Sequence, residues 1–200
     1  IVAAGVIIER YRSLKMLRSD TGELRQTVLD LLRENRVEEA LNYCNLQHGP
    51  VPAVLSAGIR KYLMLQQLGH DPARIEEQVV KAMDDYGVHV VAALERHLPV
   101  LGTVSSAAPM LGFLGTVAGM ITSFNDIVEQ MGETNIVESA SQGISQALLT
   151  TCLGLMVGIP AFMAFNYFTS VINSYVLDVE ESATELIETV TQEMALGQQA

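Results

Sequence analysis

Two long stretches of the chain carry no charged side chain, and they limit the fold more than any other feature of the sequence. Residues 98–125 form an uncharged run of 28 residues, and residues 139–177 form one of 39. A helix needs about 20 apolar residues to cross a bilayer, whereas helices of soluble domains average about 12 residues. The sequence therefore predicts an all-α membrane protein with long transmembrane helices. The alternative, two buried helices in a large soluble core, fits runs of this length less well.

The first uncharged run is rich in glycine. Its glycines stand three and four residues apart, so on a helix they share one face. Glycine weakens a helix in water by about 1 kcal/mol relative to alanine, but in a bilayer small residues let neighbouring helices approach closely. Together with Pro109 of the first run and Pro160 of the second, these glycines are expected to serve helix packing. The predicted packing residues are Gly112, Gly115, Gly119, Pro109 and Pro160.

The distribution of charge predicts the topology. All twelve Lys and Arg lie between Arg10 and Arg96, and cytoplasmic segments of membrane proteins carry an excess of basic residues. The eight apolar residues 1–8 are too few to cross a bilayer, so we interpret them as the end of a first span. The predicted segments are the end of transmembrane helix 1 at 1–8, a cytoplasmic helical domain at 9–97, transmembrane helix 2 at 98–125, a periplasmic loop at 126–138, transmembrane helix 3 with a cytoplasmic extension at 139–177, and a cytoplasmic C-terminal helix at 178–200.

Within the cytoplasmic domain, apolar periodicity predicts four helices. Thr21 is expected to cap the first, and Asp71 the last, where Pro72 would take the first helical position. A turn is predicted at residues 48–52, whose sequence is H-G-P-V-P. The predicted helices are 21–36, 37–44, 51–68 and 72–94.

The composition excludes several classes of function. A net charge of −11 argues against binding to nucleic acid, which requires clustered cations. The four histidines stand far from one another in the sequence, so we predict no metal site and no cofactor. The sequence holds no phosphate-binding loop and no nucleophile–base pair, and we therefore expect that the chain is not an enzyme.

Hydroxyl groups take the place of ionisable groups in the two complete spans. Ionisable residues usually mark ion pathways inside membranes, but neither span has one at its centre. The hydroxyls could line a pathway and meet a charged group from another chain, or they could bond back to their own helix. The second reading is favoured for Thr122, Ser141 and Ser145. Spacing alone leaves both readings open for Thr116 and Thr151, and Thr150 and Gln146 belong to the same polar stripe.

Two segments resemble a known family. G-F-L-G-T-V-A-G-M-I-T-S-F and Q-G-I-S-Q-A-L-L-T-T-C-L-G-L-M-V-G-I-P-A-F-M-A-F-N are similar to the second and third spans of the ExbB/TolQ/MotA ion-driven motor subunits. The I-P-A around Pro160 and the following Asn166 are closer to ExbB and TolQ than to MotA. The resemblance implies a pore-ring subunit in the bacterial inner membrane that couples ion flow to work on the outer membrane or envelope.

The same resemblance implies partners and a coupling ion. A pentamer of this subunit would surround a dimer of a single-span partner of the ExbD/TolR type, and a TonB- or TolA-like protein would take part. The partner carries an intramembrane Asp, and Thr116 and Thr151 occupy the positions whose hydroxyls face it. The implied coupling ion is H⁺. Thr150 beside Thr151 resembles the paired threonines of sodium-driven subunits, so Na⁺ is the alternative.

Three questions stay open at this point. Gln146 stands where many ExbB and TolQ relatives have Glu, so either that Glu is dispensable here or the ion pathway is altered. A non-conducting scaffold is the rival from another class, and it predicts that Thr116 and Thr151 tolerate alanine or serine. The sequence also leaves open which process is energised: TonB-type uptake, Tol-type envelope maintenance or motility.

Overall fold

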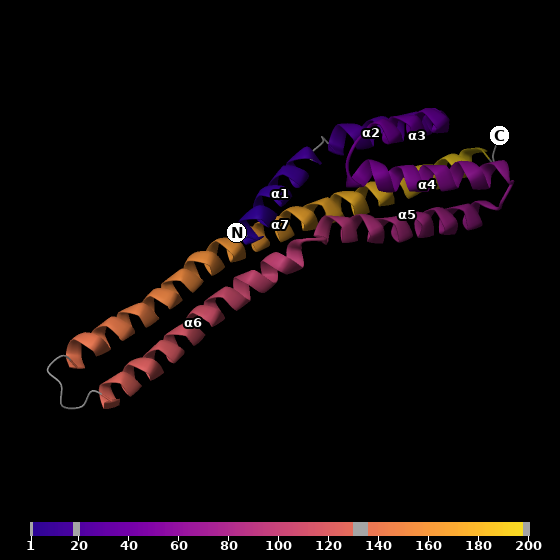
Figure 1. The fold of residues 1–200 in the computed structure, drawn as a ribbon. Helices are drawn as coiled ribbons and strands as arrows, with labels where there is room; N and C mark the ends of the chain where they lie inside the picture. The colour runs from indigo at the N-terminus through magenta and orange to yellow at the C-terminus, as the bar shows by residue number, and fades with distance from the viewer. Residues whose placement is uncertain (1, 18–20, 130–135, 198–200) are drawn as a thin grey trace. The chain divides into compact units, whose positions relative to one another are not determined.

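The computed structural model describes residues 2–17, 21–129 and 136–197, and every regular element in those ranges is a helix (Figure 1). The predicted all-α class is therefore confirmed. The helices are α1 Val2–Met16, α2 Thr21–Arg33, α3 Val37–Leu46, α4 Pro50–Gln67, α5 Pro72–Glu95, α6 Leu98–Glu129 and α7 Ile136–Gly197.

Two helical segments are long and apolar enough to cross a membrane. They are Leu98–Glu129, which is α6, and Ser141–Met194 within α7. Only 11% of the most apolar part of each is buried, whereas the core helix of a soluble protein would be mostly buried. Large apolar side chains such as Phe113, Leu148 and Met156 are exposed along this pair. A bilayer or further protein is the environment that such a surface requires.

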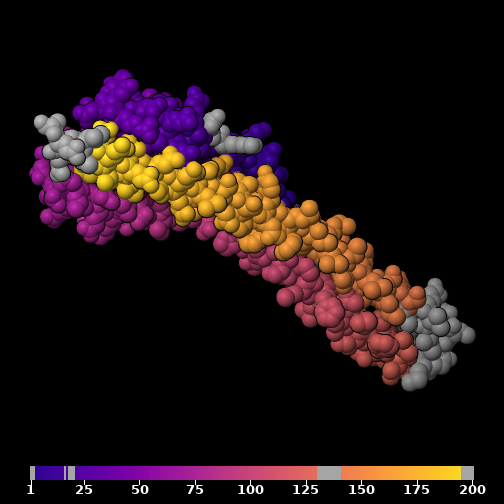
Figure 2. Space-filling model, turned by 180° about the vertical axis from the view of Figure 1, so that it is seen from behind, coloured from indigo at the N-terminus to yellow at the C-terminus, as the bar shows by residue number. Residues whose placement is uncertain are grey.

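The chain divides into two compact units. The first contains Ile1–Arg10 and His97–Thr169, and in it α6 and the orange part of α7 lie side by side and antiparallel (Figures 1 and 2). Phe165 of α7 packs on Gly102 near the start of α6, and Gly143 faces Ser123 near its end. Arg10 of α1 donates from Nη2 to Nδ1 of His97, 2.7 Å away, just before α6 begins.

The second unit contains Tyr11–Arg96 and Ser170–Ala200 and has a hydrophobic core of its own. Helices α2 to α5 supply most of that core, and Leu186 and Val190 from the last turns of α7 complete it. Arg25 of α2 holds α7 at its edge through Glu181 at 2.9 Å and Glu185 at 3.1 Å.

Several predicted boundaries differ from the structure. Helix α4 begins at Pro50, so the predicted turn at residues 48–52 is wrong in its second half; proline suits the first turn of a helix, where its missing N–H would have no partner. Asp71 occupies the N-cap of α5 with Pro72 following, but its side chain makes no capping hydrogen bond.

The predicted loop between the spans is also shorter in the structure. Helix α6 continues to Glu129 and α7 already begins at Ile136, so Asp126 is helical. The remainder of the predicted loop, residues 130–135, lies outside the described residues. Beyond it, the predicted third span and C-terminal helix form one helix of 62 residues.

Candidate functional site

The site begins where the backbones of α6 and α7 touch. A Cβ atom on Gly112 would lie 3.1 Å from the Cα of Gly154 and 3.2 Å from the Cα of Thr151. A Cβ atom on Gly154 would lie 2.7 Å from the carbonyl oxygen of Ala108. These neighbours are backbone atoms, which cannot turn aside as a side chain can. Glycine at both positions is therefore what allows the two helices to meet at this distance.

This contact brings the hydroxyls of Thr116 and Thr151 together. Thr116 is buried, and its Oγ1 is hydrogen-bonded to Oγ1 of Thr151. Thr116 Oγ1 also lies 3.2 Å from the carbonyl oxygen of Ala147, on the opposite helix, and Thr151 Oγ1 lies 3.1 Å from that of Gly112. The two residues that the sequence left undecided are thus neighbours across the helix pair.

Counting protons shows what this hydroxyl pair can do. Each hydroxyl has one hydrogen and two lone pairs, so when one threonine donates to the other, the second can donate to a carbonyl. Lone pairs on the two oxygens then remain free to accept further hydrogen bonds. Because a hydroxyl can also reverse its role, the pair can accept from a donor or donate to an acceptor brought beside it. It can do so without becoming charged.

Thr150 lies beside the hydroxyl pair but points elsewhere. Its Oγ1 donates to the carbonyl oxygen of Ala147 on its own helix at 2.6 Å. A Cβ on Gly115 would lie 2.8 Å from this Oγ1, so the absence of a side chain at Gly115 leaves room for it. Thr150 and Thr151 therefore use different neighbours on α6, although they are adjacent in sequence.

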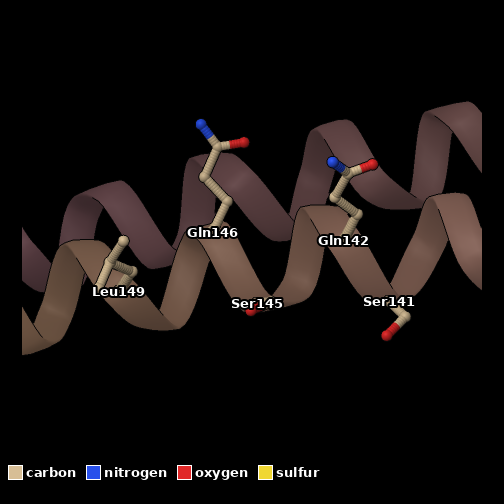
Figure 3. Close-up of a pocket in the computed structure, with 5 residues that line it drawn as sticks. All are labelled: Ser141, Gln142, Ser145, Gln146 and Leu149. Carbon is tan, nitrogen blue, oxygen red and sulfur yellow. The ribbon is translucent and has the colours of Figure 1, made fainter.

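Gln146 stands one turn before Thr150 and is exposed. It lines a surface pocket with Ser141, Gln142, Ser145 and Leu149. Figure 3 shows the amides of Gln142 and Gln146 projecting to the same side of α7, one turn apart. Thr122, by contrast, donates back to Ala118 of its own helix at 3.1 Å, as the favoured reading expects.

The predicted packing residues fall in different places. Gly119 faces Ala147, whose Cβ would be 2.8 Å from an added Cβ, and Pro109 lies against Gly158. Pro160 is inside α7 with an exposed side chain. Three glycines of α7 that pack on α6 were not among the predicted packing residues. They are Gly143, Gly154 and Gly158, and their signal was the spacing of eleven and four residues, which keeps them on one helix face.

The chain is similar in sequence to known proteins. Residues 47–181, more than half of the chain, match the sequence profile of the MotA/TolQ/ExbB proton channel family. The Tol-Pal system protein TolQ of Pseudomonas aeruginosa is 36% identical over 121 residues, which cover 60% of this chain and 52% of the relative. TolQ of Haemophilus influenzae is 26% identical over 200 residues, 98% of this chain and 86% of the relative.

The biopolymer transport protein ExbB of Pseudomonas putida is 28% identical over 175 residues, 86% of this chain and 51% of the relative. The chain thus spans about half the length of the two Pseudomonas relatives. The TolQ and ExbB relatives confirm the similarity predicted from the I-P-A segment. On the family match over residues 47–181, the chain belongs to the MotA/TolQ/ExbB proton channel family.

Proposed function

We propose that this chain is the pore-ring subunit of a motor in the bacterial inner membrane that is driven by the proton-motive force. An ion moving down its gradient would pass the hydroxyls of Thr116 and Thr151, where it neutralises and then leaves an acidic group on a partner chain. Moving one charge across the membrane yields about 2.3 kcal/mol per 100 mV, so repeated steps are needed for useful work.

One observation carries this proposal: a pair of hydroxyls, one buried and one half-buried, where the backbones of two apolar helices touch. A scaffold needs only the glycines for such packing. Hydroxyl pairs add little to helix association, since each polar contact between membrane helices contributes about 0.6 kcal/mol. What the hydroxyls add between these helices is the ability to exchange hydrogen bonds with a group that changes charge.

The acid must come from another chain, because residues 98–125 and 139–177 contain none. We propose an ExbD/TolR-like subunit with one intramembrane Asp, as a dimer inside a pentamer of this chain, with H⁺ as the coupling ion. The Tol-Pal and biopolymer transport names of the relatives support a role in energising the envelope or outer membrane, for example through a TonB- or TolA-like protein. We further propose three spans, with α2 to α5 in the cytoplasm.

Replacing Thr151 with valine tests the role of the hydroxyl. Valine keeps the volume of threonine and removes the hydrogen bond, so we expect loss of ion flux with assembly intact. The measurement is proton uptake into liposomes that contain the complex purified from native membranes, driven by an imposed potential. Thr169→Val is the matched control, because Thr169 is also on α7 but donates to Phe165 of its own helix at 2.8 Å.

The outcome separates the motor from the scaffold. Full flux in Thr151→Val would refute the assigned role. Mass spectrometry of the same purified complex tests the partner: a single-span protein with one Asp in its span is expected. A ring of this chain alone would favour the scaffold.

A further inference from the structure

An open groove of about 310 Å³ runs between α6 and α7 beside the hydroxyl pair. Its floor is made of small residues, among them Gly119 and Ala147. Its polar lining comes from both helices: Thr122, Ser123, Asp126, Gln146 and Thr150.

The hydroxyls in this groove have already used their hydrogen atoms. Thr122 donates to Ala118 at 3.1 Å, Ser123 to Gly119 at 2.9 Å, and Thr150 to Ala147 at 2.6 Å, each on its own helix. A hydroxyl that donates to its backbone presents only lone pairs to its surroundings. The groove therefore offers three hydroxyl acceptors, and the side chain of Gln146 adds a carbonyl oxygen as well as an amide donor.

The one charged residue in the lining is acidic. Asp126 lies in the last turns of α6, on the side of the groove away from the hydroxyl pair. No Lys or Arg follows Arg96 anywhere in the sequence, so no basic side chain of this chain stands near it in α6 or α7. A carboxylate among lone pairs attracts cations and repels anions. One carboxylate fits a monovalent ion, since divalent ions are usually held by several.

The groove ends at the candidate site. The carbonyl oxygen of Ala147 accepts from Thr150 in the groove and lies 3.2 Å from Thr116 Oγ1 of the pair. Thr150 is followed directly by Thr151. The oxygen atoms that line the groove thus include Asp126 at one end and, at the other, the carbonyl of Ala147, which contacts the hydroxyl pair.

We propose that this groove is a vestibule that binds a monovalent cation, hydronium or Na⁺, next to Asp126 before it reaches Thr116 and Thr151. The direction of ion movement rests on the proposed function; the cation preference of the groove does not.

Charged thiol reagents test the preference without requiring ion flux. Thr122→Cys places a thiol in the groove, in a Cys152→Ser background that removes the exposed native cysteine. The rates of modification by a cationic and an anionic methanethiosulfonate are compared in native membranes. The ratio of the two rates cancels differences in thiol ionisation. We expect the cationic reagent to be favoured, and Asp126→Asn to lower the ratio about tenfold.

Glu129→Gln is the matched control, because Glu129 is exposed one turn further along α6 and does not line the groove. A ratio that falls no more in Asp126→Asn than in Glu129→Gln overturns the proposal. Gln146→Cys repeats the measurement from the opposite helix if Thr122→Cys does not assemble.

Flux in liposomes then separates this proposal from the proposed function. Asp126→Asn should slow uptake most at low cation concentration, while Glu129→Gln should not. Stimulation by Na⁺ at fixed pH identifies sodium as the ligand, and dependence on pH alone identifies hydronium. If Thr151→Val abolishes flux but Asp126→Asn leaves it at the level of Glu129→Gln, the proposed cation vestibule is refuted and the proposed motor function is supported. If the unaltered complex carries no ion, the motor fails and the reagent ratio alone decides the vestibule.

Discussion

Gly154→Ala is the sharpest test of how the helix pair holds its hydroxyls. The added Cβ would lie 2.7 Å from the carbonyl oxygen of Ala108 and 2.9 Å from the Cα of Gly112. Ordinary contacts begin near 3.4 Å, so the backbones must separate by about 0.7 Å. Thr151 Oγ1 now lies 3.1 Å from the carbonyl oxygen of Gly112, and a shift of this size breaks that hydrogen bond.

The expected magnitude follows from this geometry. Overpacking a tight helix interface costs about 1–3 kcal/mol, and each hydrogen bond broken between membrane helices adds about 0.6 kcal/mol. The two hydrogens of the hydroxyl pair allow two such hydrogen bonds between the helices, one between Thr116 and Thr151 and one to the carbonyl oxygen of Ala147 or Gly112. We therefore expect the free energy of unfolding to fall by about 2–4 kcal/mol.

The assay is unfolding in mixed micelles by titration with a denaturing detergent, followed by helix content. Gly102→Ala is the matched control: its Cβ would meet only the ring of Phe165, at 3.3 Å, and a ring can turn aside. We expect a change within about 0.5 kcal/mol for it. Equal stabilities of Gly154→Ala and Gly102→Ala would refute the claim that backbone contact sets the distance between the helices.

Three further predictions concern the second unit, each measured as a change in the free energy of unfolding. Burial raises the pKa of the Cys44 thiol from 9.0 to about 12, so the unfolded chain ionises first; stability should be full below pH 9.0 and fall above it by about 1.4 kcal/mol per pH unit, and Cys44→Ala should remove that contribution. Arg25→Ala should cost about 0.5–1 kcal/mol, and less at high salt, because its ion pairs with α7 are partly exposed. Gly58→Ala should cost about 1–3 kcal/mol, since its Cβ would lie 2.5 Å from the sulfur of the buried Met83, and Met83→Leu should change that cost if the contact is its cause.

The sequence predicted features that depend on a single helix, namely its length and which residues share a face. Charge-free length predicted the two long apolar helices, and spacing of three and four predicted that Gly112 and Gly115 share a face. It could not predict which residues of α7 meet that face. The alignment of α6 along α7 depends on how individual side chains fit together, such as Pro109 against Gly158. The same spacing of small residues is compatible with many alignments of two apolar helices.

The candidate site shows the same limit. Nothing in the spacing of Thr116 and Thr151 distinguishes them from Thr122, which bonds back to its own helix. The resemblance to a family singled out the pair, and the structure then placed the two hydroxyls together. The groove was not predicted for a further reason. A charge after an apolar run normally marks the end of a span, so Asp126 was assigned to a loop.

The chemistry of the hydroxyl pair explains how the proposed motor subunit can do without an acid of its own beside Thr116 and Thr151. A carboxylate fixed at the position of the hydroxyl pair would be costly whenever no cation stood beside it, since an unpaired charge in hydrocarbon is strongly unfavourable. Thr116 and Thr151 are neutral with or without an ion, and each lies within hydrogen-bond distance of a backbone carbonyl of the opposite helix. In the proposed motor, the subunit with fixed hydroxyls can therefore remain in one conformation through the cycle. The free energy difference between steps then resides in the partner's acid, which is charged in some positions and neutral in others.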